Sequence, residues 1–124
     1  MMIERRQHPR VVTEFPVRVC NRLGAVMKTQ LLDLSLSGLG LAANDALVAH
    51  LQGDIQDTTR VMPEEFRVEF TLPLNDQELA IGLYCRLVYK RRLSQHAYQM
   101  GVRILKYDAE SENRLERYIH SRLI

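Results

Sequence analysis

The sequence predicts an all-β fold, a six-stranded antiparallel β-barrel of split or Greek-key-like type, with a C-terminal α-helix and a short helix near residues 44–53. Apolar and polar residues alternate with a period of two over several segments, as expected for strands with one face in a core. The stretches between these segments are short and carry Gly, Pro, Asn and Asp, which favour tight turns. Five or six strands joined in this way are typical of a small barrel or sandwich.

The first strand is expected to begin at Val11, from which apolar residues occupy alternate positions. Pro16 falls on the outward-facing set, and because proline lacks a backbone N–H, it indicates a sheet edge or a bulge. Residues 21–24 contain Asn and Gly, which tolerate the positive φ of tight hairpins. The chain is therefore expected to start with a β-hairpin.

The second predicted strand carries a change of parity. Through residues 32–37 leucines alternate with Asp33, Ser35 and Ser37, so an extended backbone would place these three polar side chains on one face. After Gly38 the alternation shifts by one residue. Such a shift needs an extra residue, a bulge or a sharp turn, and glycine permits one. We therefore expect the chain to bend where the polar residues end.

A short helix is expected next, over residues 44–53. Asn44 or Asp45 is its expected N-cap, because their side chains can accept hydrogen bonds from the free N–H groups of the first turn. Residues 54–63 are polar and end in a proline, and they are expected to form a surface loop.

The second half of the chain is expected to add three strands and the closing helix. Period-two alternation predicts the strands over residues 66–72, 79–90 and 98–104. The period then lengthens, and residues 108–123 are expected to form a helix with Asp108 as its N-cap. We expect its apolar stripe to cover one mouth or face of the barrel.

The composition limits the classes of function. A chain of 124 residues with 46% hydrophobic residues is expected to fold as one domain. Its net charge of +2 is mild, so an anion site must come from local clusters of Lys and Arg, and nucleic-acid binding is not the default. No apolar run reaches the roughly 18 residues of a membrane span, and no signal peptide is visible. We therefore expect a cytoplasmic protein.

Cysteine and histidine are too scattered for a metal site. Neither Cys20 nor Cys85 has a second Cys or a His nearby, which fits neither a zinc site nor a disulfide-rich scaffold, and two reduced thiols are expected. The sequence shows no nucleophile with a base and no pair of catalytic carboxylates. No catalytic residue, metal ligand or cofactor is therefore predicted, and an enzyme is not expected.

Two polar motifs indicate a binding site. Arg5, Arg6 and Arg10 form a basic cluster that Pro9 keeps out of a helix, so a loop leading into the first strand is expected. An arginine guanidinium can hold phosphate oxygens in a forked geometry or stack on a purine. The second motif is Asp33-Leu34-Ser35-Leu36-Ser37-Gly38. Together the two motifs predict a nucleotide ligand.

These motifs resemble those of a known family. Arg6-Gln7-His8-Pro9-Arg10 fits the pattern RxxxR and residues 33–38 fit the pattern (D/N)xSxxG, in the order and spacing of a PilZ domain. The resemblance extends to Pro16-Val17-Arg18-Val19, to Gly101-Val102-Arg103-Ile104 and to a closing helix, so it covers nearly the whole chain. PilZ domains are bacterial receptors for cyclic di-GMP, and the resemblance implies the same ligand here.

The resemblance also implies a role for each motif residue. Arg6 and Arg10 would hold phosphate and guanine, while Asp33, Ser35 and Gly38 would form the half of the site on the barrel surface. Asp33 can accept hydrogen bonds from the guanine N1–H and exocyclic amine, and Ser35 can add a hydroxyl contact. Gly38 lets the backbone approach the ligand without a Cβ in the way.

Arg5 bears on the number of ligands. Family members with arginine at this place tend to hold two mutually intercalated molecules, so two cyclic di-GMP molecules per chain are favoured, the extra guanidinium stacking on the second guanine. The resemblance implies one domain over residues 1–124, with 1–10 as a flexible ligand-binding segment, 11–105 as the barrel and 108–123 as the helix. We expect the N-terminal segment to close over the barrel on ligand binding and the new surface to be read by a partner protein. Monomer and homodimer both stay open.

Three alternatives to a cyclic di-GMP site stay open. An OB-like barrel could bind single-stranded nucleic acid, with Lys90, Arg91 and Arg92 as a phosphate track. Only 6% of residues are aromatic, however, and the predicted core face takes up Phe15, Phe66, Phe70 and Tyr98. A PilZ-shaped adaptor could bind protein alone, although such variants usually lack the arginines. The N-terminal arginines could also be a solvated tail, and Asp33 and Ser35 plain solvent-facing residues of a strand.

Overall fold

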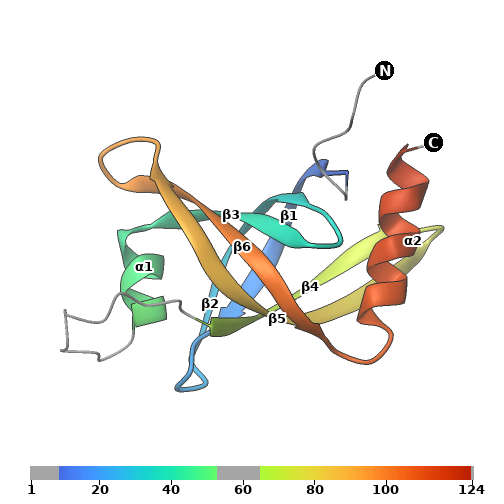
Figure 1. Cartoon of the computed structure of the whole chain (residues 1–124), viewed down its shortest axis with the longest axis horizontal. Helices are drawn as coiled ribbons and strands as arrows, with labels where there is room; N and C mark the ends of the chain where they lie inside the picture. Colours follow the sequence, from blue (N-terminus) through green and yellow to red (C-terminus); the bar gives the residue numbers. More distant parts are fainter. Residues whose placement is uncertain (1–8, 53–64, 124) are drawn as a thin grey trace.

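The computed structural model describes residues 9–52 and 65–123, which form a closed antiparallel barrel with two helices (Figure 1). The predicted fold class is confirmed. The elements are β1 (Val11–Cys20), β2 (Val26–Leu34), β3 (Gly38–Asn44), α1 (Asp45–Gln52), β4 (Glu65–Leu74), β5 (Gln77–Arg92), β6 (Ala97–Tyr107) and α2 (Ser111–Leu123).

The barrel is built from two three-stranded meanders. Strands β1, β2 and β3 pair in sequence, as do β4, β5 and β6, and the barrel closes where β3 pairs with β6 and β1 with β4. The helices lie at opposite ends of this barrel (Figure 1). Helix α1 packs on β2 and β3, whereas α2 packs on β5, β4 and β1.

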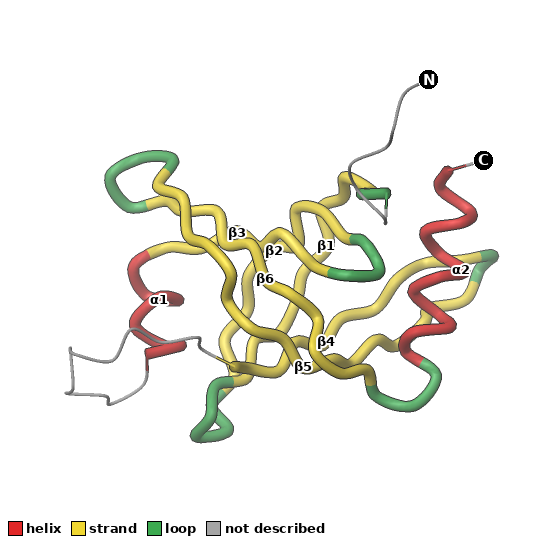
Figure 2. Tube along the Cα trace, viewed as in Figure 1, coloured by secondary structure: helices red, strands yellow, loops and turns green. Residues whose placement is uncertain are grey.

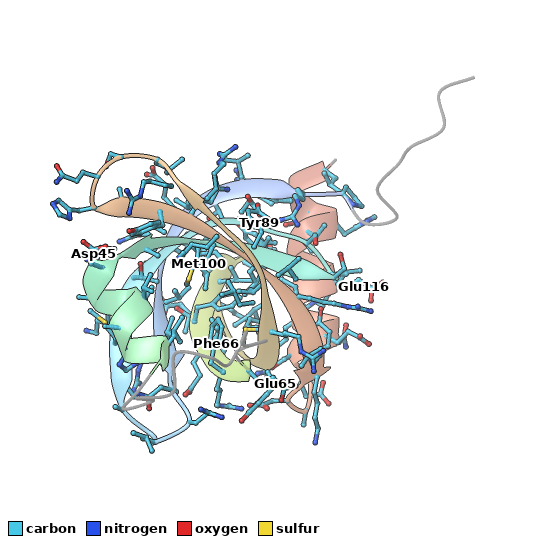
Figure 3. The ribbon with its side chains drawn as sticks, turned by 60° about the vertical axis from the view of Figure 1, so that its left-hand side comes forward. Asp45, Glu65, Phe66, Tyr89, Met100 and Glu116 are labelled. Carbon is cyan, nitrogen blue, oxygen red and sulfur yellow. The ribbon has the colours of Figure 1, made fainter. Side chains whose placement is uncertain are left out.

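The core follows from the period-two alternation of the strands. Every second side chain of β4 and β5 points inward, among them Phe66, Val68, Ile81 and Leu83, all no more than 2% exposed. Phe66 and Met100 lie in the interior of the barrel (Figure 3). Burial of such side chains contributes about 1.5–3 kcal/mol each, so the alternation fixes which face of every strand turns inward.

The predicted first hairpin is confirmed, and Asn21 organises its turn. Its Oδ1 accepts hydrogen bonds from the N–H groups of Leu23 and Ala25, both at 3.0 Å. Gly24 has a φ of 86°, which a glycine adopts without steric penalty. The side chain of Asn21 also donates to the His50 carbonyl of α1 at 3.0 Å, so the same residue ties the turn to the helix.

Pro16 lies at both a bulge and an edge, as its missing N–H predicts. The register of β1 against β2 shifts between Val12 and Phe15, directly before Pro16. On its other side β1 pairs with β4 only over residues 18–20, so Pro16 has no partner there within the described residues. A strand position without a ladder bond is one that proline tolerates.

The predicted short helix is present as α1, and Asn44 is its N-cap. The Asn44 Oδ1 accepts a hydrogen bond from the Leu47 N–H at 2.9 Å. Leu47 and Leu51 are buried, which fixes the helix over the end of the barrel. The predicted loop, residues 54–63, lies entirely outside the described residues.

The predicted start of the C-terminal helix is wrong by three residues. Helix α2 begins at Ser111, and the carbonyl of Glu110 accepts the first helical hydrogen bond, from the Arg114 N–H at 3.0 Å. Asp108 does not cap the helix because its carboxylate is held by Arg67 of β4, whose Nη1 donates to Oδ1 at 2.9 Å. A guanidinium is a stronger partner for a carboxylate than a backbone N–H, and it holds the pKa of Asp108 below its usual range.

Strands β5 and β6 are longer than predicted, and their hairpin runs past the end of β4 as an arm in which residues 87–92 of β5 pair with β6 (Figure 2). Strand β3 pairs with the other side of β6. The tip of this arm is tied to α1 through Asp45. Its carboxylate accepts hydrogen bonds from the Tyr98 hydroxyl at 3.0 Å and from His96 Nδ1 at 2.7 Å, and these bonds lower the pKa of Asp45. Such tertiary contacts are invisible in the alternation of the strands.

Gly82 is the point at which α2 is attached to the barrel. Its N–H donates to the Ser111 hydroxyl at 3.0 Å, and its carbonyl accepts from the Asp108 N–H at 2.9 Å. A Cβ at this position would overlap the Asp108 carboxylate and would lie 2.7 Å from Arg67 Nη2. A side chain at this position therefore requires the ion pair of Arg67 and Asp108 to move.

Gly82→Ala is expected to lower the free energy of unfolding by about 1–3 kcal/mol, because the added methyl group must displace the Asp108 carboxylate. Urea denaturation of both proteins measures this difference. The control is the same substitution in an Asp108→Ala protein, where the overlapping carboxylate is gone. There the cost of the methyl group should fall to less than half, and an unchanged cost would show that Asp108 is not its cause.

Candidate functional site

Of the six predicted site residues the structure describes four, which lie together where β1 begins and β2 ends: Arg10, Asp33, Ser35 and Gly38. The other two, Arg5 and Arg6, lie outside the described residues. The two motifs meet because β1 and β2 are antiparallel, with Val12 opposite Asp33. The start of one strand is thereby placed beside the end of the other.

Arg10 and Asp33 form an ion pair, in which Arg10 Nη1 donates to Asp33 Oδ1. The side chains are 30% and 19% exposed, so both remain within reach of a ligand. Arg10 Nη2 lies 3.7 Å from the place that a Cβ of Gly38 would occupy. The guanidinium is thus held between the carboxylate of β2 and the first residue of β3.

A bulge in β2 turns Asp33 to the outside of the barrel. The register of β2 against β3 shifts between Leu31 and Asp33, so Leu32 is an extra residue. In a regular strand without the bulge, Asp33 would lie on the inward face with Leu31, which is fully buried. The pattern of alternating leucines did not predict this bulge, although the adjacent pair Leu31-Leu32 is its signal in the sequence.

The expectation that Asp33, Ser35 and Ser37 share one face of a strand is wrong. Strand β2 ends at Leu34, and residues 35–37 form the turn to β3. The Ser35 hydroxyl accepts hydrogen bonds from the N–H groups of Ser37 at 3.3 Å and of Gly38 at 3.1 Å. A serine that binds backbone N–H groups two and three residues ahead stabilises a turn in preference to a strand.

Ser35 itself is buried, being 1% exposed, whereas Ser37 is exposed. The Ser35 N–H donates to the Gly38 carbonyl at 2.9 Å, and this hydrogen bond closes the turn. The bend therefore lies before Gly38 and not at it. A direct contact between the Ser35 hydroxyl and a ligand stays a prediction.

Gly38 is required by a close approach and not by its backbone angle. Among the described glycines only Gly24 has a positive φ. A Cβ on Gly38 would lie 2.5 Å from the Val102 carbonyl oxygen, so a side chain would push β6 away from β3. The pairing of the two meanders therefore depends on glycine at this position.

The turn of residues 35–37 is anchored on β6. The Ile104 N–H donates to the Ser37 carbonyl at 2.9 Å, and the Tyr107 hydroxyl donates to the Leu36 carbonyl at 2.6 Å. Burial, with a smaller contribution from the Glu112 charge, raises the pKa of Tyr107 to about 12. Tyr107 thus keeps its proton and its hydrogen bond across the ordinary pH range.

Three glycines form a floor beside the ion pair on the outer face of β3 and β6. We call Gly38, Gly40 and Gly101 the glycine floor. Gly40 pairs with Asp33 on one side and with Gly101 on the other. The space of a Cβ on Gly40 is filled by the Asp33 carboxylate, with Oδ2 2.7 Å from it, so the carboxylate lies directly over the glycine. The resemblance named Gly38 as a site residue, but nothing in the sequence placed it in a floor with the other two glycines.

Positive side chains flank the glycine floor. Arg10 lies on one side, and Arg103, which is exposed and pairs with Gly38, lies on the other. Arg86 follows Arg103 in the ladder and is paired with Glu65 at 2.6 Å. Arg103 thus adds to the positive potential over the floor, which suits an anionic ligand.

The described residues contain no group of three or more His, Cys, Asp and Glu side chains placed to bind a metal ion. Both cysteines are free thiols, and burial raises the pKa of each. Over the same residues no helix is long and apolar enough to cross a membrane. Arg10 and Asp33 instead present charged donor and acceptor groups that are partly exposed.

A separate groove, of about 480 Å³, lies between β1, the β4–β5 turn and α2. The edge-to-face pair of Phe15 and Tyr118, with ring centroids 6.1 Å apart, lies at its side. None of the four described site residues lines it. The groove is therefore distinct from the site predicted by the motifs.

Ser35→Ala is expected to destabilise the protein by about 1–3 kcal/mol, because two N–H groups in the turn lose their acceptor. Chemical denaturation with far-UV circular dichroism measures the change. Ser37→Ala is the matched control: it removes an exposed hydroxyl that lies 3.2 Å from the Ser35 hydroxyl, but it leaves both N–H groups with their acceptor, and it should change stability by less than about 1 kcal/mol. Equal effects of the two substitutions would contradict the assigned role of Ser35.

Comparison with solved structures shows where this barrel occurs. The inhibitor of motility MotI/DgrA of Bacillus subtilis superposes with a TM-score of 0.74 at 16% identity over 98% of this chain and 52% of that chain. The PilZ domain with c-di-GMP of YcgR from Escherichia coli gives 0.64 at 15% identity over 97% and 92%. The K. pneumonia MrkH–c-di-GMP complex gives 0.62 at 17% identity over 96% and 52%.

At these identities the similarity concerns the fold, and the chain spans about half the length of MotI and MrkH. No curated protein matches the sequence. The sequence profile of the PilZ domain, however, matches residues 4–121, nearly the whole chain. Together with the closed six-stranded barrel and the two motifs at one end of β1 and β2, this match shows that the chain belongs to the PilZ domain family.

Proposed function

We propose that this chain is a receptor for cyclic di-GMP and that the ligand binds over the glycine floor. The observation that carries the proposal is the pairing of Arg10 with Asp33, which joins the two motifs over a gap of 23 residues at an open, positively flanked surface. Membership of the PilZ family supports it. So do the two structural relatives whose structures contain the same dinucleotide.

Asp33 is proposed to recognise guanine. The Watson–Crick edge of guanine presents two adjacent donors, N1–H and the exocyclic amine, and a carboxylate offers two acceptors at matching separation. The bulge at Leu32 directs this carboxylate outward, and Gly40 beneath it leaves the space above the strand free of a Cβ. The Asp33 carboxylate fills that space and lies close to the sheet, where the edge of a guanine can reach its oxygens.

Arg10 is proposed to exchange its partner when the ligand binds. Its ion pair with Asp33 orients the carboxylate at the surface of the barrel. The forked guanidinium can then bind a phosphate oxygen or stack on the base while Asp33 takes the guanine donors. We propose Arg6 as the second arginine of the phosphate contact, with Ser35 and Gly38 completing the surface half of the site.

Two ligand molecules per chain are proposed because of Arg5. A second dianion adds charge that the pair of Arg6 and Arg10 does not offset, and a third guanidinium would offset part of it. The signal would be the changed surface that results when the N-terminal segment closes over bound ligand, read by a separate protein. The proposal makes the chain a cytoplasmic receptor without catalytic activity.

The nucleic-acid alternative is weakened by the arm of β5 and β6. Lys90 and Arg92 lie over the ring of Tyr98, 5.1 and 5.4 Å from its centroid, and so are engaged within the protein. Phe66, Phe70 and Tyr98 are buried and cannot stack on bases. Tyr84 and Tyr89 of β5 are exposed, but with these three rings buried a phosphate track along the arm would have few aromatic partners for successive bases.

Isothermal titration of the folded protein with cyclic di-GMP is expected to show saturable binding with two ligands per chain. Arg5→Ala is expected to reduce the stoichiometry to one. Absence of heat at tens of micromolar ligand would refute the receptor proposal, and one ligand per wild-type chain would refute the role of Arg5. Binding of single-stranded oligonucleotides with a steep salt dependence, in place of the dinucleotide, would favour the alternative.

Arg10→Ala and Asp33→Ala are each expected to weaken binding by about 10- to 150-fold, the loss of a hydrogen bond to a charged group. The same titration measures the change. Arg67→Ala is the matched control, because it breaks an arginine–carboxylate pair on β4, away from the floor. It should lower stability and leave affinity unchanged; wild-type affinity in either site variant would place the ligand elsewhere.

A further inference from the structure

The outer face of the barrel holds an aromatic side chain next to the ion pair, Tyr89 of β5. We infer that Tyr89 is a further ligand-contacting residue and that its ring stacks on or borders the base held by Asp33. The inference rests on the proposed function and adds an aromatic group to it. Neither polar motif contains this residue.

The ladder of the barrel places Tyr89 in one row with Asp33. Asp33 pairs with Gly40, Gly40 with Gly101, and Gly101 with Tyr89, across β2, β3, β6 and β5. Residues directly opposite one another in a ladder point to the same face. The row therefore runs over the outside of the barrel, with a carboxylate at one end, an aromatic ring at the other and two glycines between them.

The side chains at the two ends lean over the glycines. A Cβ on Gly40 would overlap the Asp33 carboxylate, and a Cβ on Gly101 would overlap Cε1 of Tyr89 and lie 2.5 Å from Cζ of the same ring. Gly40 and Gly101 are neighbours in the ladder, where strands are about 4.8 Å apart. The carboxylate and the ring thus rest about one strand spacing from each other.

Two bulges bring about this arrangement. Leu32 is the extra residue that turns Asp33 outward, and Val88 is the extra residue in a second register shift, between Leu87 and Tyr89. Leu87 packs against the core, and in a regular strand without the bulge Tyr89, two residues later, would face inward as well. Tyr89 is instead 47% exposed and lies outside the barrel, whereas Met100 lies inside (Figure 3).

An aromatic ring over a glycine also stabilises an antiparallel sheet by covering exposed backbone. That stabilising effect is enough to explain why Tyr89 contacts Gly101. It does not explain why a second, separate bulge directs a carboxylate onto the adjacent glycine. Recognition of a purine needs both groups, an acceptor pair for its edge and a flat apolar surface for its face. The row supplies both at one place.

The test is titration of cyclic di-GMP into three variants, Tyr89→Phe, Tyr89→Leu and Tyr89→Ala. The leucine and alanine variants are expected to bind about 5- to 150-fold more weakly, the usual loss when a base loses its aromatic partner. The phenylalanine variant keeps the ring and should stay within about threefold of wild type. Tyr84→Ala is the matched control, because Tyr84 is 40% exposed on the same strand but outside the row, and its affinity should not change.

A purely structural role of Tyr89 would change stability without changing affinity, so melting temperatures are measured in parallel. Wild-type affinity in a folded Tyr89→Leu protein would overturn the inference while leaving the proposed function intact. A wild-type protein that does not bind cyclic di-GMP at all would overturn both.

Tyr89→Trp gives a second readout, because the chain contains no tryptophan. Saturating cyclic di-GMP is expected to quench or shift its single emission band. An emission unchanged by saturating ligand would contradict the contact.

Discussion

The pairing of β3 with β6 is the contact on which the rest of the structure depends. It joins the two meanders along the full length of β3, whereas the other seam, between β1 and β4, is limited to residues 18–20. Strand β3 can make this contact because its two faces differ completely. Leu39 and Leu41 are fully buried on the inward face, while Gly38 and Gly40 leave the outward face free of side chains. One strand thus provides both the core and the floor of the proposed site.

The site combines rigid and adaptable parts. The turn of residues 35–37 is held by the buried Ser35 hydroxyl and by bonds to Tyr107 and Ile104, so its backbone has little freedom. The pair of Arg10 and Asp33 is partly exposed, and ion pairs of this kind contribute about 1 kcal/mol or less. Exchanging that pair for a ligand therefore requires little energy, while the surface beneath it keeps its shape. Such pre-organisation reduces the entropy lost on binding.

Much of the fold could be predicted from local patterns, and the site only in part. Period-two alternation identified five strand segments, and the shift of parity after Gly38 marked the bend that separates β2 from β3. Asn44 and Asp45 marked the start of α1. These signals could be read because they depend on residues close in sequence. Asp108 was misplaced as a helix cap because its partner, Arg67, lies 41 residues away. The turn at Ser35 was taken for a strand because leucines continued to alternate with serines through it.

The bulges were the other feature that the sequence did not reveal. An extra residue in a strand is recognisable only against the strand that it pairs with, and the partners of Leu32 and Val88 lie on β3 and β6. The two motifs therefore predicted that Arg10 and Asp33 meet, but not that Gly40 and Gly101 form a floor between Asp33 and Tyr89. Residues that are brought together by pairing between strands have no fixed spacing in the sequence.

The same ladder limits how the proposed signal can arise. Gly38 and Gly40 belong to strands that are hydrogen-bonded into a closed barrel. Even a side chain on Gly38 would displace β6, so the strands of the floor are packed too closely to rearrange under a ligand. A shift of β3 by one residue would destabilise the barrel, because it would move the inward-facing leucines of β3 out of the core. The surface that a partner reads should therefore change through the bound ligand and the arginines that precede β1, and not through movement of the strands. Recognition and output would then lie on one face, with Arg10, the last residue before β1, at their boundary.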